Sequence, residues 1–138
     1  MSAPHMIASH EDAVIADLMS LPVLTVEAHE TLWTAWQLLF VSGLRHLVVI
    51  NEDGSSRGVL SDRNILAEVP ATADNLGRRT VNDVMAMVRP VSIHPRQAPM
   101  AAARLMIDSV VEAIPVVDDR GRVVGIVTEA DIVRWLVS

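Results

Sequence analysis

The sequence contains no cysteine, which excludes disulfide bonds, thiolate chemistry and cysteine-ligated metals. Motifs of the common enzyme classes are missing as well: there is no G-x-S-x-G elbow, no P-loop and no G-x-G-x-x-G turn. The five histidines form neither an i, i+4 pair nor an HExxH arrangement. We therefore expect neither an enzyme nor a metal-binding protein, and no obligatory cofactor.

Positive charge and long apolar runs are also scarce. Eleven Lys and Arg stand against 17 Asp and Glu, and the formal net charge of −6 disfavours binding to the phosphates of a nucleic acid. The most apolar window, LWTAWQLLFVSGL, is interrupted by polar residues and is too short to span a bilayer. Residues 1–12 do not have the basic and apolar regions of a signal peptide, and we expect a flexible lead there. The expected location is the cytoplasm, with no membrane partner.

What the sequence does contain is an internal duplication. The segment GVLSDRNIL begins at Gly58, and the similar segment GIVTEADIV begins at Gly125, 67 residues later. The same shift pairs residues 44–66 with residues 111–133 without a gap. A repeat of this kind fixes the architecture, because each copy is one structural unit. The expected organisation is a lead at 1–12, a first repeat at 13–70, a linker at 71–79 and a second repeat at 80–138.

Both repeats have the same expected order of elements. A short helix leads to a brief strand and then to a longer amphipathic helix with apolar residues at helical spacing. Two apolar runs rich in β-branched residues follow, separated by turns that end in Gly54 and Gly121. A closing helix begins within the repeated motif. One β-α-β-β-α copy is too small to bury its sheet. We therefore predict an α+β fold with α/β-type layers, in which two copies pack sheet to sheet about a pseudo-twofold axis.

The repeated motif resembles the CBS domain, named after cystathionine β-synthase. The resemblance rests on an HLVV or IPVV strand, a turn glycine and the pattern G-apolar-apolar-[ST]-x-x-[DN]-apolar, which occurs twice at fixed spacing over residues 12–138. It implies a stand-alone tandem CBS pair with two clefts between its sheets. It also implies an adenosine-containing ligand, such as AMP, ADP, ATP or S-adenosylmethionine, and a regulatory role that acts in trans on an unknown protein partner.

The motif residues favour the same chemistry. Ser61 and Thr128 each place a hydroxyl at a strand end, where it can meet a phosphate or ribose oxygen. Three residues later, an ionised Asp131 can accept two hydrogen bonds from a ribose, whereas Asn64 offers one acceptor oxygen. Arg63 adds a partner for phosphate. The alternative is that both hydroxyls only cap the following helices and that Asp131 is a first-turn carboxylate favoured by the helix dipole.

The resemblance also implies which residues line each cleft. The Asp131 cleft is expected to hold a nucleoside, and the Asn64 cleft to depend on phosphate charge. Basic residues are concentrated in the first repeat, because Ala113 and Ala130 replace His46 and Arg63 in the second. The Asp131 cleft is expected to contain Thr128 with Thr31, Ala35, Arg45 and His46. The Asn64 cleft is expected to contain Ser61 with Ala98, Ala102, Glu112 and Ala113.

The helix that carries Trp36 has more apolar residues than it needs to pack on one small sheet. Trp135 lies on the last helix. Tryptophan is enriched in buried interfaces, so we expect a homodimer built from these two helix faces. Three functions remain open: a nucleotide-sensing regulatory module, a ligand-independent structural dimer or adaptor with closed clefts, and a nucleic-acid-associated regulator, as some CBS proteins are.

Overall fold

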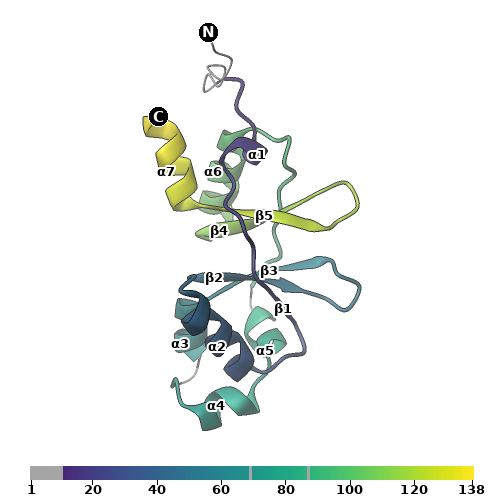
Figure 1. The fold of residues 1–138 in the computed structure, drawn as a ribbon, viewed down its shortest axis with the longest axis vertical. Helices are drawn as coiled ribbons and strands as arrows, with labels where there is room; N and C mark the ends of the chain where they lie inside the picture. Colours follow the sequence, from purple (N-terminus) through teal and green to yellow (C-terminus); the bar gives the residue numbers. More distant parts are fainter. Residues whose placement is uncertain (1–10, 69, 87) are drawn as a thin grey trace.

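Two small sheets face each other across the middle of the molecule (Figure 1). The structure is a computed structural model that describes residues 11–68, 70–86 and 88–138, so most of the expected lead lies outside the described residues. In the first sheet β1 runs parallel to β2, and β2 runs antiparallel to β3; the second sheet is the hairpin of β4 and β5. The strands are β1 (Thr25–Glu27), β2 (His46–Ile50), β3 (Ser56–Ser61), β4 (Ala113–Val117) and β5 (Val123–Thr128).

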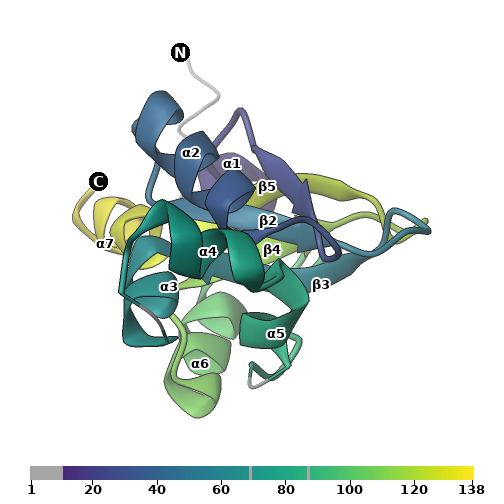
Figure 2. The same ribbon diagram turned by 90° about the horizontal axis from the view of Figure 1, so that it is seen from below.

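Helices cover the outer side of each sheet, as Figures 1 and 2 show from two directions. This layering confirms the predicted α+β fold of two hairpin-centred repeats. The helices are α1 (Ile15–Leu18), α2 (Leu32–Ser42), α3 (Asp62–Glu68), α4 (Ala73–Arg78), α5 (Val81–Met85), α6 (Pro99–Ser109) and α7 (Glu129–Val137).

Two elements differ from the prediction. The first strand of the second repeat is reduced to an isolated parallel bridge between Ile93 and Val116. Pro90 and Pro95 flank this bridge, and proline has no N–H to donate to a ladder. The expected linker at 71–79 contains helix α4, whose Leu76 is completely buried in the core of the first repeat.

The short helix that begins each repeat packs on the other repeat. Ile15 of α1 is fully buried in the core of the second repeat, beside Ile114 and Ile132. Met85 of α5 is fully buried in the core of the first repeat, beside Leu60. Figure 1 shows this exchange directly: α1 lies in the upper half with α6 and α7, and α5 lies in the lower half with α2 and α3. The two repeats are therefore interlocked.

A third apolar cluster joins the two sheets. Val48 of β2 is fully buried there, together with Ala113 of β4 and Ile126 of β5. Val23, Ile50, Val59 and Val123 pack against this cluster as partly buried neighbours. The inner faces of both sheets are thus apolar, as expected for sheets that pack face to face.

The motif glycines allow the exchanged helices to approach. A Cβ atom on Gly125 would lie 2.5 Å from Sδ of Met19 and 3.0 Å from its Cγ, and one on Gly58 would lie 2.8 Å from Cε of Met85. Real Cβ atoms do not come this close to other heavy atoms. At Gly125 the Met19 side chain therefore occupies the space that a side chain would need. At Gly58 the close atom is only the terminal methyl group of Met85, and the φ of 140° is a second reason for glycine there.

We expect Gly125→Ala to destabilise the fold by roughly 1–3 kcal/mol, the usual cost of overpacking a filled site. In a Met19→Ala background the same substitution should cost clearly less, because the methionine side chain that it would meet is gone. Urea denaturation of the four proteins in this cycle measures the difference. Gly77→Ala is the matched control, since a Cβ atom there would meet nothing within 4 Å beyond its chain neighbours and its own helix backbone, and alanine favours a helix. Equal costs in both backgrounds would contradict the packing role of Gly125.

Candidate functional site

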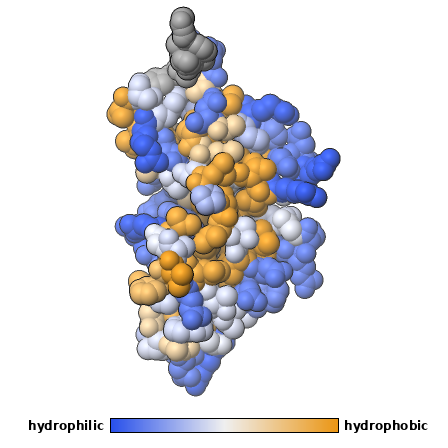
Figure 3. Space-filling model, in the orientation of Figure 1, coloured by the Kyte–Doolittle hydropathy of each residue, from blue (hydrophilic) through white to orange (hydrophobic). Residues whose placement is uncertain are grey.

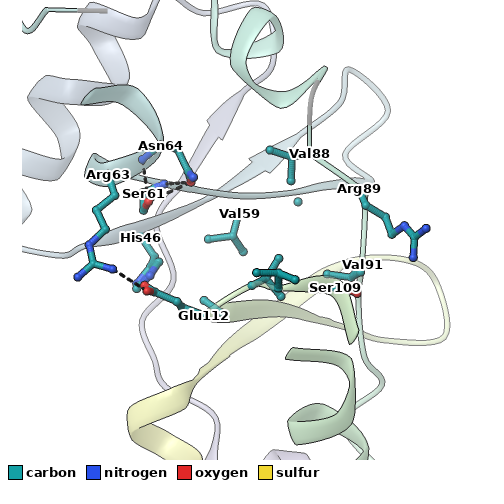
Figure 4. A pocket seen from close by; sticks show the side chains of 14 residues that line it. His46, Val59, Ser61, Arg63, Asn64, Val88, Arg89, Val91, Ser109 and Glu112 are labelled. Carbon is teal, nitrogen blue, oxygen red and sulfur yellow. Dashed lines mark hydrogen bonds and ion pairs between the residues drawn. The ribbon is translucent and has the colours of Figure 1, made fainter. Parts of the chain in front are cut away.

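A hollow of about 300 Å³ opens between the two repeats (Figure 4). One wall comes from β2, β3 and the start of α3, and the other comes from residues 88–91 and from the chain between α6 and β4. One end carries polar and charged side chains, and valines line the middle. The lining residues are His46, Gly58, Val59, Ser61, Arg63, Asn64, Val88, Arg89, Val91, Ser109, Val110, Val111, Glu112 and Ala113.

The polar end contains a reciprocal pair of hydrogen bonds between Ser61 and Asn64. The Oδ1 atom of Asn64 accepts from the backbone N of Ser61 and from its Oγ, both at 2.9 Å, and the Ser61 Oγ accepts from the backbone N of Asn64 at 3.1 Å. A backbone N–H can only donate, so the amide oxygen must face Ser61. The NH₂ group of Asn64 is then the part of the side chain left to meet a ligand, as a donor and not as the acceptor that the sequence suggested.

Asp131 is enclosed by its own neighbours. Asp131 is only 3% exposed. The Oδ2 atom accepts from the backbone N of Thr128 at 2.8 Å, while Ser20 Oγ lies 2.9 Å from Oδ1 and 3.1 Å from Oδ2. Arg134 also donates to Oδ1. Both oxygens are therefore engaged within the protein, and Thr128 caps α7 as the alternative interpretation predicts.

The chain that follows α1 covers β5 beside Asp131. Ser20 forms an antiparallel bridge with Ile126, in which the Ser20 N donates to the Ile126 carbonyl oxygen at 2.7 Å. The corresponding stretch after α5 is joined to β3 by a side-chain contact and not by a backbone bridge. There Arg57 donates its guanidinium hydrogens to the carbonyl oxygens of Met85 and Val88. The hollow of Figure 4 lies on the Asn64 side. A second hollow, of about 440 Å³, lies on the Asp131 side and is lined by Ala13, Asp17, Leu18, Met19, Ser20, Asp131, Arg134, Trp135 and Ser138.

The structure groups the predicted site residues differently from the sequence. His46, Glu112 and Ala113 line the hollow that contains Ser61, Arg63 and Asn64. His46 therefore lies on the Asn64 side and not beside Asp131, because β2 and β4 meet where the two sheets pack together.

The remaining predicted wall residues lie elsewhere. Ala35 and Ala102 are completely buried in the two repeat cores, so neither can line a cleft. Thr31 caps α2 and bridges to Thr80, and Ala98 is the N-cap residue of α6. Arg45 is exposed next to His46 but does not line the hollow.

The valine wall and Arg89 were not predicted from the sequence. One signal was available at Val110, which corresponds to Gly43 under the shift of 67 residues. Gly43 ends α2 with φ 73°, and Val110 ends α6 with φ 55°. A β-branched residue rarely adopts this left-handed conformation, and such strain is concentrated at functional sites. A valine at a position suited to glycine thus marks the rim of the hollow.

Opposite charges meet at the polar end. The Nη1 atom of Arg63 lies 2.8 Å from Oε1 of Glu112, so that an ion pair joins the first repeat to the second (Figure 4). Burial lowers the pKa of His46 below 6.5, and Arg45 lowers it further, whereas Glu112 and Asp62 act to raise it. Since burial is the largest of these influences, His46 is neutral at pH 7.

Two negative findings apply to the part of the chain that the structure describes. Within it, no three or more His, Asp or Glu side chains gather in a way that can hold a metal ion. Within the same residues, no helix is both long enough and apolar enough to cross a bilayer.

Comparison with known proteins assigns the family. The family model of the CBS domain matches residues 15–71 and again residues 81–138. The chain belongs to the CBS domain family. A CBS domain-containing protein of Dictyostelium discoideum is 27% identical over 133 residues, with 91% of this chain and 92% of that protein covered.

A homoserine O-acetyltransferase of Methanococcoides burtonii is 31% identical over 122 residues. That match covers 88% of this chain but only 24% of the acetyltransferase. The CBS pair therefore spans about a quarter of the length of this relative.

Solved CBS pairs share the fold. The CBS domain pair of protein MJ0100, in complex with 5′-methylthioadenosine and S-adenosyl-L-methionine, is 27% identical with a TM-score of 0.74, covering 90% of this chain and 95% of that one. CBSX2 of Arabidopsis thaliana, in complex with AMP, is 26% identical with a TM-score of 0.70, covering 91% and 96%. Both likenesses extend over nearly the whole of each chain.

The lowered pKa of His46 predicts a pH dependence of stability. Below pH 6.5 the unfolded histidine takes up a proton that the folded one resists, so the free energy of unfolding falls as the pH falls. His46→Gln removes this contribution and should lose less stability than the wild type between about pH 7 and pH 5. Urea denaturation at several pH values measures both curves. His29→Gln, at an exposed histidine between β1 and α2, is the control for the substitution itself. Parallel curves for His46→Gln and the wild type would contradict the assignment.

Proposed function

We propose that this CBS pair is a cytoplasmic regulatory module that binds an adenosine-containing nucleotide in the hollow beside Asn64 and acts in trans on a protein partner. The observation that carries the proposal is the hollow itself, which combines valine walls with a polar end rich in hydrogen-bond donors. Val59 projects into its middle from β3, with Val88 and Val91 nearby (Figure 4). Such a site suits a planar apolar base joined to an acceptor-rich sugar and phosphate.

The donors favour a phosphate-bearing ligand over a free nucleoside. Arg63 and the NH₂ group of Asn64 lie at the polar end, and Asn64 Oδ1, which already accepts from Ser61, is not free to accept from a ribose. The adenosine compounds bound by the MJ0100 pair and by CBSX2 support the same ligand class. AMP, ADP and ATP are therefore the first ligands to test, with S-adenosylmethionine next.

The two other functions remain alternatives with separate tests. A ligand-independent adaptor would need closed clefts, whereas hollows lie beside both Asn64 and Asp131. At the second hollow the Asp131 oxygens are already bonded within the protein. A nucleic-acid-associated regulator would need a basic surface, which the net charge of −6 disfavours. Gel shifts at several salt concentrations test the latter, since phosphate contacts weaken steeply with salt.

Calorimetry with adenosine, AMP, ADP, ATP and S-adenosylmethionine tests the proposed site. Val59→Trp fills the hollow and should weaken nucleotide binding by at least about tenfold, because the base loses its space. Asp131→Ala is the control: it removes a capping carboxylate and lowers stability, but we expect its nucleotide affinity to stay within about threefold of the wild type.

Two outcomes would count against this placement. If Asp131→Ala abolishes binding while Val59→Trp leaves it intact, the ligand lies on the Asp131 side. If no ligand binds the wild-type protein, the ligand-independent adaptor becomes the favoured function. Circular dichroism of each variant shows whether it is folded.

We also propose that the pair forms a homodimer through α2 and α7. Figures 1 and 2 place these helices on the same side of the molecule, and Figure 3 shows apolar surface in a band down the middle of the face and near the end of α2. Trp36 and Trp135 are partly buried against the two repeat cores, so they are not the centre of this surface. The exposed apolar residues are Trp33, Phe40 and Val41 on α2 and Val133, Leu136 and Val137 on α7.

Phe40→Glu tests the dimer without disturbing the core, because Phe40 is 82% exposed. Sedimentation at micromolar concentration should show the wild type at twice the chain mass of 15.0 kDa and the variant largely at the single-chain mass. Burying a charge in an apolar interface is costly, which is why the substitution should dissociate the pair. A wild type that sediments as a single chain would end this proposal. Arg104→Glu, a substitution in α6 outside the surface defined above, serves as the control.

A further inference from the structure

The ion pair between Arg63 and Glu112 lies at the polar end of the proposed nucleotide site. Arg63 lies in the first turn of α3, and Glu112 directly precedes β4, so the contact links the two repeats at the polar end of the hollow. Figure 4 shows both side chains reaching toward each other beside His46. The side chains are 68% and 47% exposed, which leaves the pair open to solvent and to a competing anion.

The two partners differ in how firmly they are held. The backbone carbonyl of Glu112 accepts a hydrogen bond of 3.0 Å from the backbone N of Glu129, which fixes the base of the carboxylate side chain. Arg63 has a long flexible stem, and its guanidinium forms no other contact recorded among the described residues. A competing anion can therefore draw Arg63 away, while Glu112 stays beside the site.

The charges at the polar end balance when the pair is closed. Arg63 is neutralised by Glu112, and burial keeps the pKa of His46 low. Arg89 is exposed at the opposite end of the hollow and has no ion-pair partner among the described residues (Figure 4). A neutral nucleoside meets no net charge at the polar end. A phosphate must replace the carboxylate as the partner of Arg63.

We propose that Glu112 is an internal competitor for the ligand phosphate: it occupies Arg63 in the empty site, and a phosphate-bearing ligand opens this contact between the repeats when it binds. The proposal rests on the nucleotide-binding function proposed above. Exposed ion pairs of this kind shift an equilibrium by no more than about fivefold, so a phosphate with two charges can displace the carboxylate. Ligand binding thereby exchanges a contact between the repeats for a contact with the ligand, and Glu112 sets the preference for phosphate charge.

Glu112→Gln should tighten the binding of AMP and ADP by about two- to fivefold, because the carboxylate that competes for Arg63 is removed. Adenosine affinity should change by less than about twofold, since adenosine has no phosphate to compete. Arg63→Gln should weaken AMP and ADP, and in that background Glu112→Gln should lose most of its effect. Calorimetry on the wild type, both single variants and the double variant measures the cycle. Arg89→Gln removes the same charge at the opposite end and should leave the effect of Glu112→Gln intact.

The outcomes separate this proposal from the nucleotide-binding function. If the wild type binds AMP and Glu112→Gln binds it equally or more weakly, the competition is wrong while the function stands. A full gain from Glu112→Gln in the Arg63→Gln background would also overturn it, because the effect would be general repulsion. If Glu112→Gln binds AMP and the wild type does not, the result supports the competition. If no variant binds any nucleotide, both proposals fail together.

Discussion

The side chains of Met19 and Met85 pack directly on the backbone of the opposite repeat, at Gly125 and Gly58. These two contacts interlock the repeats, because each methionine comes from a segment that begins one repeat and packs in the core of the other. Neither hairpin alone has enough apolar partners to bury both faces. The exchange supplies the missing partners, and the inner faces of the sheets then close against each other around Val48 and Ile126.

The same exchange explains why the two sides of the molecule differ. When Met19 packs on Gly125, the next residue, Ser20, lies on β5 and its hydroxyl donates to Asp131. The residue after Met85 is Ala86, which has no hydroxyl to offer. Asn64 therefore bonds only with Ser61 among the described residues, and its side of the pair stays open. Asp131 therefore lies where Ser20 can donate to it, whereas Asn64 lies where Ala86 offers no such donor.

Much of the fold was predictable because local patterns determine it. The ungapped shift of 67 residues aligned the two hairpins, and their β-branched runs and turn glycines predicted the strands. The exchange of α1 and α5 was not predictable in the same way, since a short apolar helix can pack on either core without any change in its sequence pattern. The reduced first strand of the second repeat had a local cause in Pro90 and Pro95, which a closer look at proline positions predicts.

The site was predictable in its chemistry more than in its grouping. Ser61, Arg63 and Asn64 followed from one continuous motif, and they do lie together. His46 and Glu112 come from different repeats, and their meeting depends on how the sheets pack, which no spacing along the chain records. The valines that line the hollow lie in strands and connecting segments, where an apolar residue usually belongs to the core. Their sequence pattern therefore did not predict that they line a hollow.

Methyl NMR of the folded protein during titration with AMP most directly tests the claim that a nucleotide binds in the hollow beside Asn64, because it reports on each side of the molecule separately. The account predicts saturable shifts for the methyl groups of Val59, Val91 and Val111, which line the hollow beside Asn64. The Met19 methyl group lies beside the Asp131 hollow, where the carboxylate is already bonded within the protein, and it should remain unchanged. Shifts centred on Met19 with none at Val59, or no shift anywhere at saturating AMP, would contradict the account.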